Sequence, residues 1–434
     1  MSLRDEVVEL LRRLIQADTV NPPGNETRAA EVLQEYLEGN GVSCKLYAKI
    51  PERANLVARI PGRRGGPRLL LLSHTDTVLA DPEEWSVDPW SAEVRDGHVW
   101  GRGALDMKGQ VAASAVAIAS LAREGFEPRG DLIFVAAADE EVGEAEQFGL
   151  PWLVDEHPDA VEAEYSINEG AGDRLVLGEG PFYFCSTAEK MASPFRLRVR
   201  GRSGHGSMPA IADNALVKAA KLIERLAEFK AEPELGPEVE AILKTVLGEV
   251  PPLEQVIEFA RALNPGMAEL IEPLLSMTVA PTMIKASGKR NVIPGVCEVT
   301  VDCRLLPGQT QDEAGEILLS FLGEGDYELE WIRAYGGTRS PLESPLWDAV
   351  SSFVEKSEPG ARAVPVCVAG FTDSHWLRER FGTVAYGFFP MRAMDPELAA
   401  RLIHSADERV AIEDLELGLD FLRHAAIALG DGTR

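Results

Sequence analysis

The strongest constraint on the fold is the wholly apolar run Leu132–Ala138, because the three carboxylates Asp139, Glu140 and Glu141 follow it directly. A short run of this kind is typical of a strand that is buried on both faces. Other short apolar runs alternate with stretches of helical periodicity before about residue 180 and again after about residue 337. We therefore expect an α/β fold with a mostly parallel sheet and helices on both faces, and Glu140 and Glu141 at the carboxyl end of one strand.

The pattern of elements changes twice along the 434 residues, a length that exceeds one ordinary domain. Residues 1–187 and 336–434 alternate helix and strand, which predicts one α/β domain in two parts. Residues 188–335 follow the order strand, helix, strand, strand, helix, strand, which predicts an inserted α+β domain of the split βαβ type. A segment at about 232–272 exceeds that plan and indicates an added helical insertion.

Charge and composition exclude several classes of partner. With 43 basic and 70 acidic residues the net charge is −27, which disfavours nucleic acid and anionic membranes. No apolar stretch reaches the roughly 18 residues of a membrane helix, and the first sixteen residues form an amphipathic pattern without the apolar centre of a signal peptide. The five cysteines are scattered and none belongs to a CxxC pair. We expect reduced thiols in a cytoplasmic protein and no thiolate metal site.

Two carboxylates side by side at a strand end cost free energy unless a positive group holds them, and a metal ion is such a group. The chain offers matching ligand types after other strands or turns, in the motifs SHTD, LDMKG, NEG and HSADER. The candidate ligands in these motifs are His74, Asp106, Glu169 and His404. Together with one of the two glutamates they predict a five-ligand, two-metal site, with the other glutamate left as a free carboxylate base.

Geometry along the chain suggests the roles of these residues. His74 and Asp76 are two apart in extended chain and point to the same side, so Asp76 would fix the tautomer of a ligating His74. The two oxygens of Asp106 allow it to bridge two metals. Glu140 and Glu141 point opposite ways, so one would bind metal and the other would face the reacting water.

Each motif also has an ordinary alternative. The HxD pair could be a surface histidine beside an acid, and Asp106 or Glu169 could be a helix cap. The two glutamates could begin an exposed acidic loop that continues to Glu144 and Glu146, and His404 could mark a helix terminus. Taken together these alternatives require five coincidences along one chain.

The chain contains the motifs LLLSHTDTV, VWGRGALDMKG, ADEEVG, INEG, GRSGHGSMP, NVIPG, VDCRLLPG and HSADERV. Through these motifs it resembles, over nearly its whole length, the dinuclear zinc family of aminoacylase, acetylornithine deacetylase, succinyl-diaminopimelate desuccinylase, carboxypeptidase S and bacterial glutamate carboxypeptidase. The resemblance implies two Zn²⁺ ions, for which Co²⁺ could substitute. One ion would be held by His74, Asp106 and Glu169, and the other by Asp106, Glu141 and His404. Glu140 would be the general base and Asp76 the residue that orients His74. Ser73 stands where the family often has glycine.

The resemblance also implies a lid and dimerisation role for residues 188–335 and a homodimer in which His205 reaches the partner's active site. Asn291, Arg304 and Thr372 would be substrate-binding residues, although Arg304 could equally be an ordinary surface arginine. The expected reaction is hydrolysis of an amide bond in N-acyl amino acids or small peptides with a free carboxylate. An aminopeptidase of the same family and a non-catalytic relative that binds a partner through the lid stay open as alternatives. A two-metal phosphoesterase is disfavoured because no phosphate-cradling glycine loop accompanies the ligands.

Overall fold

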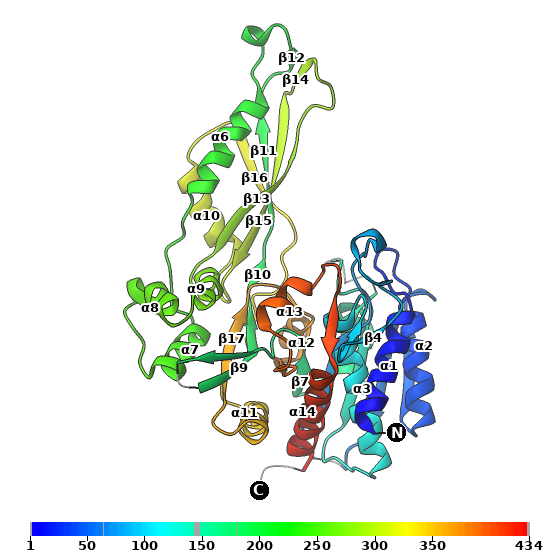
Figure 1. The fold of residues 1–434 in the computed structure, drawn as a ribbon. Helices are drawn as coiled ribbons and strands as arrows, with labels where there is room; N and C mark the ends of the chain where they lie inside the picture. The colour runs from blue at the N-terminus through cyan, green and yellow to red at the C-terminus, as the bar shows by residue number, and fades with distance from the viewer. Residues whose placement is uncertain (1, 64, 143–147, 179, 432–434) are drawn as a thin grey trace. The chain divides into compact units, whose positions relative to one another are not determined.

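The computed structural model describes residues 2–63, 65–142, 148–178 and 180–431, and the chain in it divides into two compact units (Figure 1). Unit 1 consists of Met1–Thr187, Ser340–Val366 and Thr372–Arg434, and unit 2 consists of Ala188–Arg339 and Cys367–Phe371. The first division falls where the sequence pattern places it. The return to unit 1 falls between Arg339 and Ser340 instead of between residues 335 and 336.

Unit 1 is built on a nine-stranded sheet in the order β1-β2-β6-β3-β7-β18-β9-β17, with β8 paired to β9. The strands are β1 (Ser43–Ala48), β2 (Ala54–Ile60), β3 (Leu69–His74), β6 (Leu132–Ala137), β7 (Tyr165–Asn168), β8 (Arg174–Leu177), β9 (Gly180–Glu189), β17 (Arg362–Val368) and β18 (Val384–Gly387). The central pairings β6–β3, β3–β7 and β7–β18 are parallel, whereas β1–β2, β2–β6 and β18–β9 are antiparallel. The expected parallel centre is therefore confirmed.

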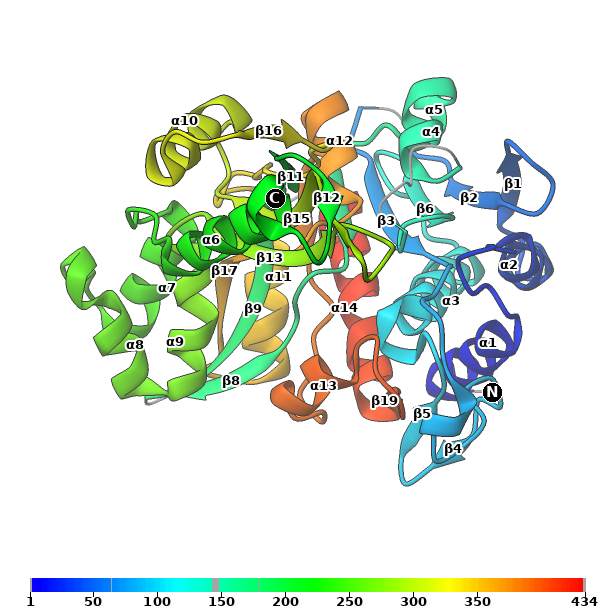
Figure 2. The same ribbon diagram turned by 90° about the horizontal axis from the view of Figure 1, so that it is seen from above.

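Helices cover both faces of this sheet. The helices of unit 1 are α1 (Leu3–Gln16), α2 (Thr27–Gly39), α3 (Gly109–Arg123), α4 (Leu150–Glu156), α5 (Pro158–Val161), α11 (Pro345–Ser357), α12 (Ser374–Phe381), α13 (Pro396–Leu402) and α14 (Ile412–Asp431), of which α13 packs beside β19 instead of on the large sheet. In β3, Leu69 and Leu71 pack into a core with α1, α3 and α14, while Leu70 and Leu72 pack into a second core with α4, α5 and α12. Figure 2 shows β3 and β6 lying between these two groups of helices. Alternate side chains thus face opposite cores, which explains why the strands are apolar throughout.

A small three-stranded sheet brings two distant parts of unit 1 together. It consists of β4 (Val94–Arg95), β5 (His98–Trp100) and β19 (Arg409–Ala411), and Arg409 pairs with Trp100 in its antiparallel register. The turn that follows β5 therefore lies beside the segment that precedes β19.

Unit 2 contains an antiparallel sheet with two long helices. Strands β10 (Met191–Ala192), β11 (Phe195–Arg200), β13 (Thr278–Lys285), β15 (Val296–Leu305) and β16 (Tyr327–Trp331) form the sheet, and β12 (Gly204–His205) pairs with β14 (Val292–Ile293). Leu222 and Leu226 of α6 (Ala215–Glu228) share one core with Leu318 of α10 (Gln311–Leu322) and with the inward residues of the sheet. The element order is the one expected from the sequence.

The segment that exceeds the minimal plan is helical, as predicted. It contains α7 (Pro237–Leu247), α8 (Val256–Leu263) and α9 (Pro265–Ile271). Buried Lys190 fastens its far end, because the ammonium Nζ donates to the carbonyl oxygens of Pro273 (2.7 Å) and Ser276 (2.9 Å). Among the residues described in either unit, no helix has the length and apolar content needed to cross a membrane.

Candidate metal centre

Three neighbouring parallel strands of unit 1 end at one edge of the sheet with ligand-type residues. His74 is the last residue of β3, Glu169 follows β7 directly, and Glu140 and Glu141 come shortly after β6. Because β3 pairs in parallel with both β6 and β7, these carboxyl ends meet. The sheet alone therefore gathers one imidazole and three carboxylates.

Asp106 reaches the same edge from the turn Ala104–Lys108, which precedes α3. Its backbone is not helical (φ −119°, ψ 93°), the peptide bond to Met107 is cis, and Gly103 at the start of the turn has φ +85°. No side chain caps α3, whose N-cap residue is Lys108. Asp106 is therefore not the helix cap that its sequence position allowed.

Glu408, which directly precedes β19, holds this turn in place. One oxygen of its fully buried carboxylate accepts hydrogen bonds from the backbone N–H groups of Leu105 (2.8 Å) and Asp106 (3.1 Å). The other oxygen accepts from the backbone N–H of Gly103 (3.0 Å) and from Nη1 of Arg102 (2.6 Å). One side chain thus ties the Asp106 turn to the segment that carries His404.

The five ligand candidates form two sets that share Asp106. In the first set, Nε2 of His74 lies 3.2 Å from Oδ1 of Asp106 and 3.6 Å from Oε2 of Glu169. In the second, Nε2 of His404 lies 3.1 Å from Oδ2 of Asp106 and 3.1 Å from Oε2 of Glu141. Each oxygen of Asp106 therefore faces a different histidine, which is the arrangement expected of a bridging carboxylate.

Mutual charge perturbs these groups strongly. Burial disfavours a charged His74, but the carboxylate of Glu169 and the hydrogen bond with Asp106 outweigh it and raise the pKa of His74 well above its ordinary value. Hydrogen bonds with Asp106 and Glu141 raise the pKa of His404 to about 10. Burial raises the pKa of Glu169 and of Glu141. The edge of the sheet is thus a concentration of negative charge that favours bound cations.

The residues fit a pair of divalent metal ions. Each set offers one imidazole and two carboxylates, a donor combination that suits zinc and similar transition metals. Oε1 of Glu141 is buried and has no hydrogen-bond partner among the described residues, so that oxygen is available to a ligand. A buried carboxylate oxygen without a partner costs free energy, which a cation would offset.

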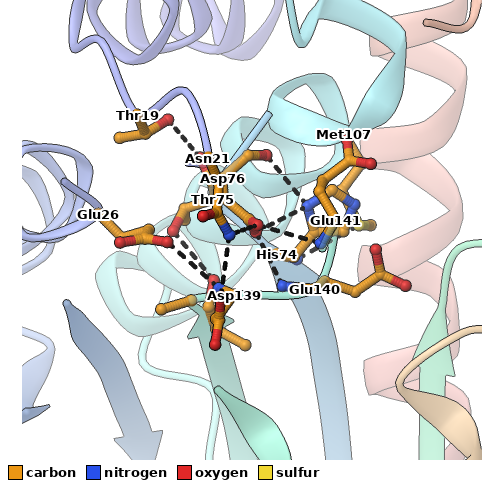
Figure 3. Close-up of polar contacts among 12 residues, drawn as sticks. Thr19, Asn21, Glu26, His74, Thr75, Asp76, Met107, Asp139, Glu140 and Glu141 are labelled. Carbon is orange, nitrogen blue, oxygen red and sulfur yellow. Dashed lines mark hydrogen bonds and ion pairs between the residues drawn. The ribbon is translucent and has the colours of Figure 1, made fainter. Parts of the chain in front are cut away.

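Asp76 and Glu140 stand outside both sets. Nδ1 of His74 faces two oxygens of Asp76, the backbone carbonyl oxygen at 3.2 Å and Oδ1 at 3.4 Å, on the side of the ring away from Asp106. The same carboxylate accepts the backbone N–H groups of Glu140 (Oδ1, 3.1 Å) and Glu141 (Oδ2, 3.1 Å), whose side chains then diverge (Figure 3). Burial and the nearby carboxylate of Glu169 raise the pKa of Glu140 well above its ordinary value. Of the two glutamates, Glu141 belongs to a ligand set and Glu140 to neither. Glu144 and Glu146 lie outside the described residues.

The loop before α12 adds a further carboxylate to this region. Thr372 is buried and its Oγ1 accepts the backbone N–H of Ser374 (3.3 Å). Asp373 is also buried, and burial followed by the charge of Glu169 raises its pKa well above the ordinary value, although His74 acts in the opposite sense. Thr372 therefore lies next to a carboxyl group whose pKa depends on the charges of Glu169 and His74.

The other expected substrate-binding residues belong to unit 2. His205 and Asn291 lie together, because β12 pairs with β14 and the backbone N–H of Gly206 donates to the carbonyl oxygen of Asn291 (2.8 Å). Arg304 lies elsewhere in the unit, on β15, where its guanidinium makes a bidentate contact with Asp302 (2.9 and 3.1 Å). Their relation to the metal ligands stays a prediction, and Arg304 has a protein carboxylate as its present partner.

Several residues that support the site were not identified from the sequence. Glu408 lies in the same HSADER motif as His404. Nothing in the sequence shows that the carboxylate oxygens of Glu408 accept hydrogen bonds from backbone N–H groups about 300 residues earlier in the chain. Asp139 precedes the glutamate pair. Asn21, in the loop between α1 and α2, and Arg53, just before β2, both donate to its carboxylate in the folded chain. The only local signal was the glycine- and proline-rich stretch that follows Asn21.

Comparisons with known proteins agree with this geometry. Residues 70–428 match the peptidase family M20/M25/M40. The chain is 28% identical over 367 residues to the N-fatty-acyl-amino acid synthase/hydrolase PM20D1 of Xenopus tropicalis, covering 81% of this chain and 70% of that protein. It is 28% identical over 433 residues to aminoacylase-1 of Sus scrofa, covering 97% and 95%.

The fold is similar to that of a solved structure. The crystal structure of the M20 family metallo-carboxypeptidase Sso-CP2 from Sulfolobus solfataricus superposes with a TM-score of 0.75 at 20% identity, covering 99% of this chain and 100% of that one. The family model spans more than half of the chain and includes every metal-ligand candidate from His74 to His404. The chain therefore belongs to the peptidase family M20/M25/M40 and is a metal-dependent hydrolase.

Proposed function

We propose that the chain hydrolyses an amide bond in N-acyl amino acids or small peptides that carry a free carboxylate. The observation that carries this proposal is the pair of ligand sets joined through Asp106, with the carboxylate of Glu140 beside them and belonging to neither. The names of two curated relatives, an N-fatty-acyl-amino acid synthase/hydrolase and an aminoacylase, favour N-acyl amino acids over other amides.

In this proposal each ligand set has one zinc ion, for which Co²⁺ could substitute. The first set is His74, Asp106 and Glu169, and the second is Asp106, Glu141 and His404. When bound, such ions supply positive charge that acidifies water and polarises a carbonyl group.

The proton transfers fall to Glu140. Its carboxylate would accept a proton from water as the oxygen bonds to the amide carbon, and would return that proton to nitrogen as the carbon–nitrogen bond breaks. Its backbone N–H donates a hydrogen bond to the carboxylate of Asp76, which also contacts His74. One carboxylate therefore contacts both the proposed base and a residue of the first ligand set. The products are a carboxylic acid and an amine.

Unit 2 would supply a homodimer interface. Its edge strand β13 presents the exposed apolar side chains of Met283 and Ile284, and α6 exposes Leu216 and Val217. Exposed apolar groups on an unpaired sheet edge are typical of a surface that pairs with another chain. A two-fold dimer through this surface would allow His205 of one chain to act in the site of the other, as the family resemblance implies.

The proposal also assigns the protein to the cytoplasm. All five cysteines are free, and Cys185, Cys297, Cys303 and Cys367 are buried. Burial raises the pKa of the Cys185 and Cys367 thiols, which keeps them protonated and unreactive. Such cysteines suit a reducing compartment.

The substrate class is tested with purified, zinc-loaded protein and a panel of matched compounds. The panel contains N-acyl amino acids of increasing acyl length, dipeptides, the carboxamide of each, and free-amine aminopeptidase substrates. We expect kcat/KM for the free acids to exceed that for their carboxamides by about 10-fold or more, as for the loss of one charge-assisted contact. Equal turnover of acids and carboxamides would contradict the proposal and would favour the aminopeptidase alternative.

The general base is tested separately with Glu140→Gln. This variant keeps the size of the side chain and is expected to lose nearly all hydrolysis while KM changes little. A matched control is Glu397→Gln, which alters an exposed glutamate of α13 that pairs with Arg401. Substantial hydrolysis by Glu140→Gln would remove Glu140 from the mechanism.

A further inference from the structure

The loop between α1 and α2 lies against the segment that carries His74 and Asp76. The hydroxyl of Thr19 donates to the carbonyl oxygen of Thr75 (2.6 Å), and the backbone N–H of Asn21 donates to the carbonyl oxygen of Thr77 (2.9 Å). The backbone N–H of Thr77 donates to the carbonyl oxygen of Thr19 (3.2 Å). The loop is therefore attached along the whole of the motif that begins the first ligand set.

The side-chain amide of Asn21 bridges two buried carboxylates. Its Nδ2 donates to Oδ2 of Asp76 (2.9 Å) and to Oδ1 of Asp139 (2.9 Å), and all three residues are at most 5% exposed. Both neighbours are carboxylates, so the nitrogen of the amide and not its oxygen must face them. The two hydrogens of one amide are thus divided between two like charges.

Arg53 holds the far end of this bridge. Its Nη2 donates to Oδ1 of Asp139 (2.7 Å) and to Oε1 of Glu26 (2.7 Å), and its Nε donates to Oε2 of Glu26 (2.5 Å). Gly24 has φ +75°, and a Cβ at that position would lie 2.2 Å from Nε of Arg53. The loop is shaped around the guanidinium, and any side chain at position 24 would displace it.

Asn21 adds hydrogen-bond donors, not charge, to a cluster that is rich in carboxylates. Three buried carboxylates, Glu26, Asp76 and Asp139, face the single guanidinium of Arg53, which reaches only Glu26 and Asp139. The hydrogen bonds of Asp76 within the cluster shown in Figure 3 come from the Asn21 amide and from the backbone N–H groups of Glu140 and Glu141. The Asn21 amide therefore holds Oδ2 of Asp76, while Oδ1 of the same carboxylate faces the ring of His74.

We propose that Asn21 is a positioning residue of the metal centre: its amide, anchored through Asp139 to Arg53, holds the carboxylate of Asp76 in the orientation that aligns His74 and the backbone of Glu140. This inference rests on the proposed roles of the two ligand sets. A loss of the amide lets Asp76 rotate, so His74 loses its fixed ring orientation and the first set binds its metal more weakly. Glu140 is displaced at the same time because Oδ1 of Asp76 holds its backbone.

The test measures zinc affinity by chelator competition in the full chain, independently of any substrate. Asn21→Leu keeps the size of the side chain and removes both donated hydrogens. Combined with His404→Ala, which disables the second set, it isolates the first. We expect the zinc Kd of the first set to rise about 10-fold or more, the range found for residues that orient metal ligands. In the single variant Asn21→Leu at saturating zinc, kcat should fall while KM stays within about two-fold of the wild-type value.

Two further variants separate positioning from general stability. Thr19→Val lies in the same loop, is equally buried and removes the bond to Thr75 without touching a carboxylate, so its zinc affinity should stay within about two-fold of wild type. If Asn21→Leu does not fold, Arg53→Lys carries the test, because a lysine cannot bond Glu26 and Asp139 together as the guanidinium does. It too should weaken the first set.

Unchanged zinc affinity in a folded Asn21→Leu chain, or in Arg53→Lys where that variant replaces it, would overturn the inference and leave the proposed function intact. An equal loss in Thr19→Val would also overturn it, since attachment of the loop and not the Asn21 amide would then control the site. Failure of the wild-type chain to bind zinc would overturn the proposed function itself and this inference with it.

Discussion

Replacing Glu408 by glutamine should destabilise unit 1 more than any surface change, although the two side chains have the same shape. The carboxylate accepts four hydrogen bonds, two at each oxygen, from three backbone N–H groups and from Arg102. Glutamine replaces one oxygen by an NH₂ group, which would then face two donors. Two of the four bonds are lost, and buried Arg102 loses the charge that neutralises it.

The magnitude follows from these contacts. A hydrogen bond to a charged group contributes roughly 1.5–3 kcal/mol, and removal of one partner from a buried ion pair costs roughly 3–5 kcal/mol. The two estimates describe overlapping contacts and are not summed, so we expect a loss of about 4 kcal/mol in the free energy of unfolding. At roughly 2–4 °C per kcal/mol for a domain of this class, the melting temperature should fall by about 10 °C.

The assay is guanidinium denaturation and calorimetry of the metal-free protein, with Glu397→Gln as the control for loss of one acidic charge. Glu397 and its partner Arg401 are both exposed, and an exposed pair of this kind contributes little, so the control should unfold with wild type. A loss below about 1 kcal/mol in Glu408→Gln would contradict this expectation, because the Asp106 turn would then hold its shape without the two bonds that the glutamine NH₂ group cannot accept.

Two further predictions concern unit 2. Burial lowers the pKa of Lys190 to about 8, so between pH 8 and 10 the unfolded chain retains a proton that the folded chain has released. The free energy of unfolding should therefore rise with pH in this window, relative to that of Lys190→Met. Equal pH slopes for the two proteins in denaturation experiments would contradict this prediction. For the dimer, mixing inactive His205→Ala chains with inactive Glu140→Ala chains should recover part of the hydrolytic activity, because one site of each heterodimer has a normal base and a normal histidine. Heterodimers that form without recovering activity would exclude a role for His205 across the interface.

The parts of the fold that follow from local periodicity could be predicted from the sequence. The apolar run Leu132–Ala138 is β6 almost in full, and the alternating stretch Val296–Leu305 is β15. The long strand β9 (Gly180–Glu189) was not predicted, because its residues are buried almost throughout and follow neither alternation nor a helical period. The helical insertion was recognised because the segment is longer than the split βαβ plan requires. The positions of its three short helices could not be predicted, because no pattern in the sequence indicates what they pack against.

The candidate metal ligands could be brought together from the sequence because each follows a strand or a turn that the sequence marks, and because parallel strands end at one edge. The supporting contacts could not. Arg53 and Asp139 lie 86 residues apart and Arg102 and Glu408 lie 306 apart, and their partners include backbone N–H groups that no residue pattern records. Such contacts depend on how loops meet after the sheet has formed.

The proposed chemistry requires that five residues hold two metal ions while Glu140 holds none; the five are His74, Asp106, Glu141, Glu169 and His404. Metal content after reconstitution and gel filtration tests it most directly. We predict two zinc ions per chain for wild type, one for His404→Ala, and two for Glu140→Gln together with a loss of hydrolysis. A Glu140→Gln chain that retains fewer than two ions, or a His404→Ala chain that retains both, would contradict the claim.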